Sequence, residues 1–354
     1  MKRFNTVSFD YKARFLLHGR ASYKQCSESS WIVSPEEKAI SPKAIFDPKD
    51  LDKIVNVQNE TSIDRERERI FGGETAHAPT IAYQLKDIKA SNGNLYKGNM
   101  KYGLRSDRDK FFVDSPFEEI PSGCLACSAM GSKYFGHWMR DDIPKYLASK
   151  EIALPLSYMG QMTDHQKDYS SLFGITPENY LSGHITELTI LEDYGQNSSK
   201  RDRYELLRSK IKNKFQSSPK SGVMILRGSS GEKRGLINEA EVIDFLKRNN
   251  FDIVDPERHS VEEIISKCRV DILIGVEGSQ LAHFNYAGND NGAIITLQPP
   301  NRFNNVYKDY ADCVEMTYGF VVGNIGKSGG FTIDISRLEK IISLANDRVN
   351  TKIF

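Results

Sequence analysis

The fold is decided by Gly222-Val-Met-Ile-Leu-Arg-Gly-Ser-Ser-Gly-Glu-Lys-Arg-Gly235 and, further along the chain, by Gly275-Val-Glu-Gly-Ser-Gln-Leu-Ala-His283. Each is an apolar run that leads into a Gly-containing turn, and the first turn is also basic. A helix that follows such a turn leaves backbone N–H groups unpaired at its start, and these suit a phosphate. The two stretches together predict a site for a phosphorylated ligand, and a nucleotide is the ligand we expect.

Strand and helix signals alternate cleanly around these two stretches. The expected strands are 223–226, 252–254, 270–276 and 293–297, and the expected helices are 239–248, 260–268 and 278–287. Ser260 and Glu263 are spaced as a capping box at the start of the second helix. Such alternation predicts a parallel sheet with helices on both faces, whose ligand lies at the carboxyl ends of the strands.

The N-terminal half is more irregular. Short strands are expected at 79–85, 92–98 and 101–104, around an Asn92-Gly93 turn, and further strands at 152–156 and 184–190. Helices are expected at 132–149, 163–173 and 200–215, and Thr163 and Gln166 are spaced as a capping box at the start of the second. The polar segment 216–221 is a linker candidate, and a last helix is expected at 335–347. We therefore predict an N-terminal domain (1–216), a C-terminal nucleotide-binding domain (217–330) and a terminal helix (331–354).

Composition excludes several classes of protein. A net charge of +1 over 354 residues argues against a nucleic-acid binder, and no apolar run reaches the ~20 residues of a membrane span. The odd count of five cysteines suits a reducing compartment, and the first residues lack the apolar region of a secretory signal. We expect a cytoplasmic protein, and peripheral membrane association stays open. Cys124 and Cys127 are expected to be buried structural thiols rather than half of a zinc site.

Two sets of residues resemble the family 61 glycosyltransferases, which include bacterial capsule-type enzymes, plant xylan enzymes and animal O-mannose N-acetylglucosaminyltransferases. The first is Phe135-Gly-His137-Trp-Met-Arg-Asp141-Asp142-Ile-Pro144. The second combines Ile225-Leu-Arg227, Lys233-Arg234, Asn238-Glu239, Phe251-Asp-Ile-Val-Asp-Pro256 and Gly275-Val-Glu-Gly-Ser-Gln-Leu281. The resemblance covers roughly residues 75 to 320. It implies a GT-B-like two-domain α/β architecture with Rossmann-like parallel sheets, and a metal-independent inverting transfer from a nucleotide-sugar.

The donor site is expected in the C-terminal domain. Without a metal, cations and backbone amides must stabilise the departing diphosphate. The candidate donor-binding residues are Arg227, Lys233, Arg234, Glu277, Gly278, Ser279 and Gln280. The family commonly has His-Gly-Ala where this chain has Glu277-Gly278-Ser279. A carboxylate there would repel a diphosphate unless it points away or meets a cation. Glu277 could instead accept hydrogen bonds from ribose hydroxyls, or it could be a structural turn residue.

An inverting transfer also needs a general base for the acceptor hydroxyl. His137 and Asp141 are four residues apart, so on a helix they share a face and can touch. Asp142 lies on an adjacent face, and Pro144 is expected to perturb the turn. The candidate catalytic residues are thus Asp141, His137 and Asp142, and the alternative is a solvated acidic face paired with Arg140 or Lys145.

These observations predict an inverting glycosyltransferase of glycan or polysaccharide biosynthesis, with a nucleoside-diphosphate sugar, in the first place a UDP-sugar, as co-substrate. No other cofactor and no metal are expected. The acceptor is an oligosaccharide or polysaccharide held by the N-terminal domain. Two alternatives stay open: a nucleotide-sugar-binding module without turnover, and another GT-B-like sugar-phosphate transferase.

Overall fold

The computed structural model of the chain describes residues 3–104, 112–113, 118–158, 162–180, 182–228, 234–326 and 329–352. They form two compact units. Unit 1 lies within residues 1–37 and 78–203, and unit 2 within 38–77 and 204–354.

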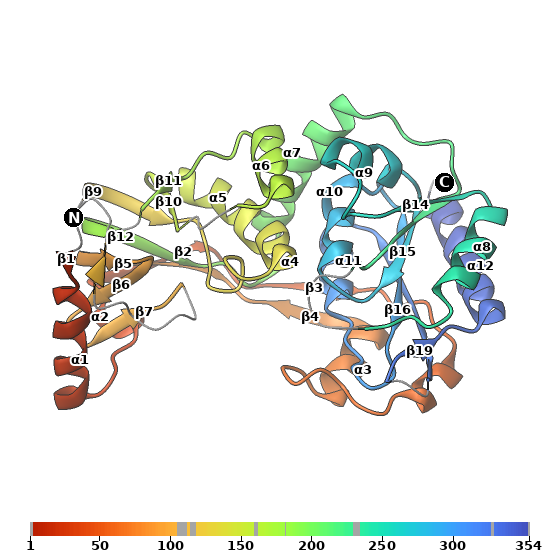
Figure 1. Ribbon diagram of the computed structural model, residues 1–354, viewed down its shortest axis with the longest axis horizontal. Helices are drawn as coiled ribbons and strands as arrows, with labels where there is room; N and C mark the ends of the chain where they lie inside the picture. Colours follow the sequence, from red (N-terminus) through yellow and green to blue (C-terminus); the bar gives the residue numbers. More distant parts are fainter. Residues whose placement is uncertain are drawn as a thin grey trace. The chain divides into compact units, whose positions relative to one another are not determined.

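Unit 1 is built on a mixed eight-stranded sheet in the order β11-β10-β9-β12-β5-β6-β7, with β2 paired to β5 off this path (Figure 1). Its strands are β2 (Ser29–Ser34), β5 (Thr80–Ser91), β6 (Asn94–Lys97), β7 (Met100–Tyr102), β9 (Glu118–Leu125), β10 (Pro155–Ser157), β11 (Glu178–Asn179) and β12 (Ser182–Glu192). The part from β11 to β12 is parallel, whereas β2, β5, β6 and β7 pair antiparallel. The expected parallel order therefore holds for only part of this sheet.

The turn between β5 and β6 forms as the sequence predicts. Asn92 and Gly93 both have positive φ, at 48° and 79°, which is the geometry that favours Asn-Gly in a two-residue hairpin. A Cβ atom at Gly93 would lie 2.4 Å from the ring of Tyr158, so the close approach also requires glycine here.

The helices of unit 1 flank this sheet. They are α1 (Thr6–His18), α2 (Tyr23–Cys26), α4 (Phe135–His137), the π-helical turn η2 (Trp138–Asp142), α5 (Ile143–Lys150), α6 (Asp164–Phe173) and α7 (Ser198–Lys214), which ends in unit 2. The predicted capping box at Thr163 and Gln166 starts α6. A separate pair of short strands joins β1 (Arg3–Phe4) to β8 (Phe112–Val113).

Unit 2 contains the predicted parallel sheet, in the order β14-β13-β15-β16-β17. All four strand pairs are parallel. The strands are β13 (Gly222–Ile225), β14 (Phe251–Val254), β15 (Ile272–Val276), β16 (Ala293–Gln298) and β17 (Thr317–Val322). Every residue of β15, β16 and β17 is buried, as expected for a sheet covered on both faces.

Helices cover both faces of this sheet, with α8 and α12 on one side and α9, α10 and α11 on the other (Figure 1). Their bounds are α8 (Glu239–Arg248), α9 (Val261–Cys268), η3 (Ser279–His283), α10 (Phe284–Ala287), α11 (Val306–Cys313) and α12 (Ile335–Lys352). Ser260 and Glu263 form the predicted capping box before α9. The predicted helix 278–287 begins instead as the 3₁₀ turn η3 and continues as the four-residue α10.

Residues 38–77 add a peripheral part to unit 2. Its elements are β3 (Glu37–Ser41), η1 (Pro48–Lys53), α3 (Ile63–Phe71) and β4 (Gly73–His77), and the strands β18 (Asn324–Ile325) and β19 (Phe331–Thr332) form a further small sheet. The chain passes between the compact units after residues 37, 77 and 203, the last of these within α7, whereas segment 216–221 is a loop. The predicted domain bounds stay a prediction, because compactness does not establish which segment folds alone.

Candidate active site

The carboxyl ends of three neighbouring strands of unit 2 carry the candidate donor residues. Arg227 follows β13, Glu277 follows β15, and Arg302 lies in the loop after β16. Arg234 joins them from the segment before α8. The parallel topology therefore gathers these side chains at one sheet edge, as the strand order predicts.

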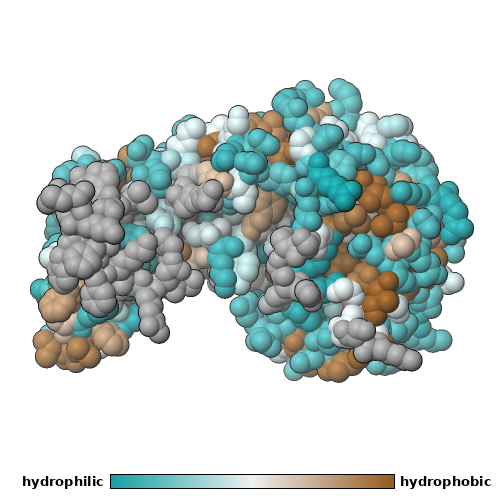
Figure 2. Space-filling view, in the orientation of Figure 1, coloured by the Kyte–Doolittle hydropathy of each residue, from teal (hydrophilic) through white to brown (hydrophobic). Residues whose placement is uncertain are grey.

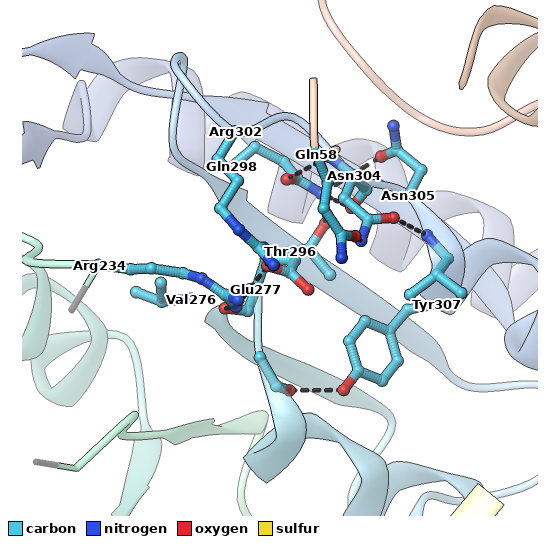
Figure 3. Close-up of polar contacts among 12 residues, drawn as sticks. Gln58, Arg234, Val276, Glu277, Thr296, Gln298, Arg302, Asn304, Asn305 and Tyr307 are labelled. Carbon is cyan, nitrogen blue, oxygen red and sulfur yellow. Dashed lines mark hydrogen bonds and ion pairs between the residues drawn. The ribbon is translucent and has the colours of Figure 1, made fainter. Parts of the chain in front are cut away.

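Glu277 is the centre of this cluster. Its side chain is only 6% exposed, and one carboxylate oxygen, Oε2, accepts hydrogen bonds from Arg234 Nη1 and, at 2.9 Å, from Arg302 Nη1 (Figure 3). Its backbone carbonyl accepts from Arg227 Nη1 at 2.9 Å and from Arg234 Nη1 at 2.6 Å. A lone carboxylate at this position would repel a diphosphate. The Glu277 carboxylate is bound to two arginines, which compensate its negative charge. Its contact with ribose stays a prediction.

The Arg227 guanidinium lies in a site crowded with positive charge. Burial lowers its pKa, the neighbouring Arg234 lowers it further, and Glu277 opposes both effects. Three guanidinium groups, those of Arg227, Arg234 and Arg302, bond to Glu277 in the contacts described. The local charge balance therefore favours an added anion.

Gly278 allows this packing. A Cβ atom there would lie 1.7 Å from Arg227 Nη1, so a larger residue would push the guanidinium away. The Gly278 carbonyl accepts a 2.5 Å hydrogen bond from the Tyr307 hydroxyl (Figure 3). Gln280 turns its amide back to the Val276 carbonyl at 2.5 Å and is 8% exposed, whereas Ser279 is exposed. The Gln280 amide N–H is thus bonded to the backbone four residues earlier, within its own turn.

Two predicted donor features are not supplied here. Lys233 lies outside the described residues. The helix after Gly278 is short and starts with a 3₁₀ turn, so its dipole is a weaker source of positive charge than the expected α-helix 278–287. The arginine side chains are therefore the main source of positive charge at this edge among the described residues.

Buried amides fix the loop that carries Arg302. Gln298, fully buried at the end of β16, donates to the Asn304 carbonyl at 2.7 Å. Asn305 is also fully buried, and its backbone N–H donates to Glu66 at 2.6 Å (Figure 3 draws Gln298, Asn304 and Asn305). Such satisfied polar networks rigidify the backbone they hold. Sequence reasoning missed Arg302 and Tyr307, although the Gln298-Pro-Pro-Asn-Arg302 turn after an apolar strand was a usable signal.

The candidate catalytic residues lie in unit 1, on the helical segment from α4 to α5. The turn η2 between them is π-helical, and the Ile143 N–H donates to the Trp138 carbonyl five residues back. Pro144 explains the wide turn, because its ring would clash with the Arg140 carbonyl in a regular α-helix and it has no N–H to donate. The predicted perturbation by Pro144 is confirmed.

His137 and Asp141 touch, as their spacing predicts. His137 Nδ1 lies 2.8 Å from Asp141 Oδ2, and the two side chains are 32% and 27% exposed. Burial alone raises the pKa of Asp141, but His137, Lys200 and Arg140 lower it by more, so the pKa lies well below its ordinary value. An ionised Asp141 accepts a proton poorly but orients a histidine well. This arrangement allows His137 Nε2 to accept a proton while Asp141 holds the ring.

A buried cation supports the pair. Lys200, at the start of α7, is fully buried, donates to the Asp193 carbonyl at 3.0 Å and lies 3.6 Å from Asp141 Oδ1. Arg203, one turn on, forms a two-pronged ion pair with Asp193 and donates to the Pro144 carbonyl at 3.0 Å. These contacts tie the helix of the His137–Asp141 pair to α7. Sequence reasoning missed Lys200, because a lysine in an exposed-looking basic helix gives no sign of its burial.

Asp142 points to a different partner. It is 4% exposed and accepts hydrogen bonds from Ser128 N at 3.2 Å and Ser128 Oγ at 2.8 Å. Burial raises the pKa of Asp142 to about 7, against the opposing effects of Lys145 and Ser128. A Cβ atom at Gly131 would lie 1.9 Å from its Oδ2. Asp142 therefore holds the loop that precedes α4, and it does not contact His137 in this arrangement.

The thiols are placed as predicted. Cys124 and Cys127 are buried and free, and burial raises the pKa of each thiol to about 11. Within the described ranges, no group of three or more His, Cys, Asp or Glu side chains is placed to hold a metal. None of the helices in the part of the chain that the structure describes has the length and apolar character needed to cross a membrane.

The fold defines a mixed α/β protein with a parallel sheet and an arginine-rich carboxyl edge. The glycosyltransferase 61 family model matches residues 135–294, so this part of the chain is similar to the family 61 glycosyltransferases. The matched range contains the His137–Asp141 pair, Arg227 and Glu277, and the family implies glycosyltransferase activity. No curated protein matches the chain.

Proposed function

We propose that the protein is an inverting glycosyltransferase that takes a sugar from a nucleoside-diphosphate donor, with a UDP-sugar as the first donor to test. The glycosyltransferase 61 family supplies the reaction class. The observation that carries the donor proposal is the cluster of Arg227, Arg234 and Arg302 around Glu277, at the carboxyl ends of parallel strands.

In this proposal the arginines of unit 2 stabilise the diphosphate as it departs. Guanidinium groups match phosphate oxygens in pairs and keep their charge at all working pH values. Glu277 holds two of them by its carboxylate, so their position is set before the ligand arrives. Electrostatic groups that are already oriented cost no reorganisation during the reaction.

Unit 1 supplies the base in this proposal. His137 takes the proton of the acceptor hydroxyl at Nε2, and Asp141 stabilises the imidazolium that forms at Nδ1. The hydroxyl oxygen attacks the anomeric carbon as the bond to the diphosphate breaks. An oligosaccharide or polysaccharide acceptor, a GT-B-like arrangement and a cytoplasmic location belong to the same proposal.

The decisive experiment is calorimetric titration of nucleoside diphosphates into Arg227→Ala. Loss of one charged hydrogen-bond partner typically costs ~1.5–3 kcal/mol, so affinity should fall about ten- to a hundredfold. Arg248→Ala is the matched control, because Arg248 is exposed on α8 and bonds only to its own helix among the contacts described. Unchanged affinity in a folded Arg227→Ala protein would make this arginine structural.

The same titrations separate the main alternative. A binding module without turnover would bind the nucleotide-sugar but release no nucleoside diphosphate from a donor panel. Release that depends on an acceptor, and that is lost in Arg227→Ala, would support transfer.

A further inference from the structure

Helix α1 (Thr6–His18) has two apolar faces, and only one of them packs on the unit. Ser8 is buried, its N–H bonds to Asn5, and the Tyr11 ring lies 5.5 Å from the Tyr96 ring on β6. Asn5, which caps the helix, also accepts from the Ser91 hydroxyl at the end of β5. The helix is therefore fixed to the sheet along this face.

The opposite face is apolar and open to solvent. Phe9, Ala13, Leu16 and Leu17 repeat at positions i, i+4, i+7 and i+8, which is the spacing of a single helical stripe. Phe9 is 63% exposed, Leu16 82% and Leu17 76%. Figure 2 shows hydrophobic atoms at the lower left, where Figure 1 draws α1. Single exposed apolar residues are ordinary, but a stripe along ~12 Å of helix marks an interaction surface.

Positive charge borders the stripe. Lys12 and Arg14 are exposed on α1, and Arg20 follows it. The single acid, Asp10, already pairs with Arg14 at 3.1 Å. Residues 1–20 contain five Lys or Arg and one Asp, a net charge of +4 in a chain whose total is +1. The excess of basic residues is thus concentrated where the apolar stripe lies.

We propose that α1 is an interfacial helix that docks this unit onto an anionic lipid surface. An apolar stripe bordered by basic residues inserts at the boundary of headgroups and acyl chains, and its binding rises with apolar area and with negative lipid charge. A second copy of the chain fits the surface less well. A symmetric pair would place the same basic residues against each other.

The test is co-sedimentation of the full chain with vesicles of phosphatidylcholine alone or of equimolar phosphatidylcholine and phosphatidylglycerol. We expect binding to the anionic vesicles and its weakening by high salt. Leu16→Gln with Leu17→Gln should lower partitioning about ten- to a hundredfold, and Lys12→Gln about fivefold. Ile40→Gln is the matched control, because Ile40 is 77% exposed but lies on β3, and it should bind as the wild type does.

Three results would overturn the proposal. The first is wild-type protein that stays in solution with anionic vesicles, and the second is a double leucine variant that binds them as well as the wild type does. The third is a wild-type dimer in sedimentation velocity that the double variant loses, which would make the stripe a self-interface. The proposal is independent of turnover, since vesicle binding needs no donor, and the double variant should keep its affinity for nucleoside diphosphates.

Discussion

Replacing Asp141 by Asn separates proton transfer from donor binding. The side chain keeps its shape but loses its charge, and His137 Nδ1 loses an ionic partner 2.8 Å away. The imidazolium that forms during transfer is then no longer stabilised. We expect transfer to fall by roughly 10²–10⁴, the usual contribution of a positioned base. This loss corresponds to about 2.7–5.5 kcal/mol of activation free energy.

The change also acts on Lys200. Its ammonium group lies 3.6 Å from Asp141 Oδ1, and in the variant it keeps the Asp193 carbonyl as a partner. We therefore expect the free energy of unfolding to fall by about 1–3 kcal/mol, since a buried charge loses part of its compensation. Urea unfolding checks this value and shows whether the variant is folded at the assay temperature.

The assay is steady-state transfer to an acceptor, combined with titration of the nucleoside diphosphate. Nucleotide affinity should stay within a few-fold of wild type, because Asp141 belongs to unit 1 and the arginine cluster to unit 2. Asp142→Asn is the comparison, since this neighbouring carboxyl binds Ser128 instead of His137, and its turnover should stay within about tenfold of wild type. Near-normal transfer by Asp141→Asn would refute the reasoning. Lost nucleotide binding in a folded variant would mean that this helix contributes to the donor site.

Three further results are expected. Transfer should persist in excess EDTA, because the arginine cluster can neutralise the diphosphate itself; complete loss that manganese or magnesium restores would contradict this. Glu277→Gln should unfold at a lower temperature, because Arg234 and Arg302 lose their anion, and a nucleoside diphosphate should stabilise this variant more than the wild type; an equal thermal shift would argue against a shared site. Because the pKa of folded Asp142 is raised to about 7, the folded state holds a proton there that the unfolded chain has released above about pH 4. This group should therefore reduce stability as pH rises from 4 to 7, by at most about 1.4 kcal/mol per pH unit, and Asp142→Asn should flatten that slope in unfolding measured against pH.

Local patterns predicted the elements whose causes are local. The capping boxes at Thr163 and Ser260, the Asn92–Gly93 turn and four of the five strands of the parallel sheet all depend on residues within a few positions of one another. The contact of His137 with Asp141 was predicted for the same reason, because helical spacing alone brings them together.

Long-range features were not predicted. The antiparallel pairing of β5 with β12 joins Ser91 to Ser182, and no local signal encodes such a partner. Lys200 reaches Asp141 only through the packing of α7. Strand β17 was also not predicted, although it has a local signal. Its Tyr318-Gly-Phe-Val-Val322 run is apolar and wholly buried.

The wide turn at Trp138–Asp142 rotates the residues before it about the helix axis, relative to α5. A π-helical turn takes up one more residue than an α-helical turn, and one residue corresponds to about 100° of rotation. The turn thus sets the direction in which everything before it faces relative to α5. Asp141 and Asp142 are adjacent in sequence, but with this rotation they contact different residues. Asp141 contacts His137, and Asp142 accepts a hydrogen bond from Ser128. With alanine in place of Pro144 we expect the turn to close to regular α-helix; His137 and Asp141 would keep their i, i+4 contact, and the direction in which this pair faces relative to α5 would change.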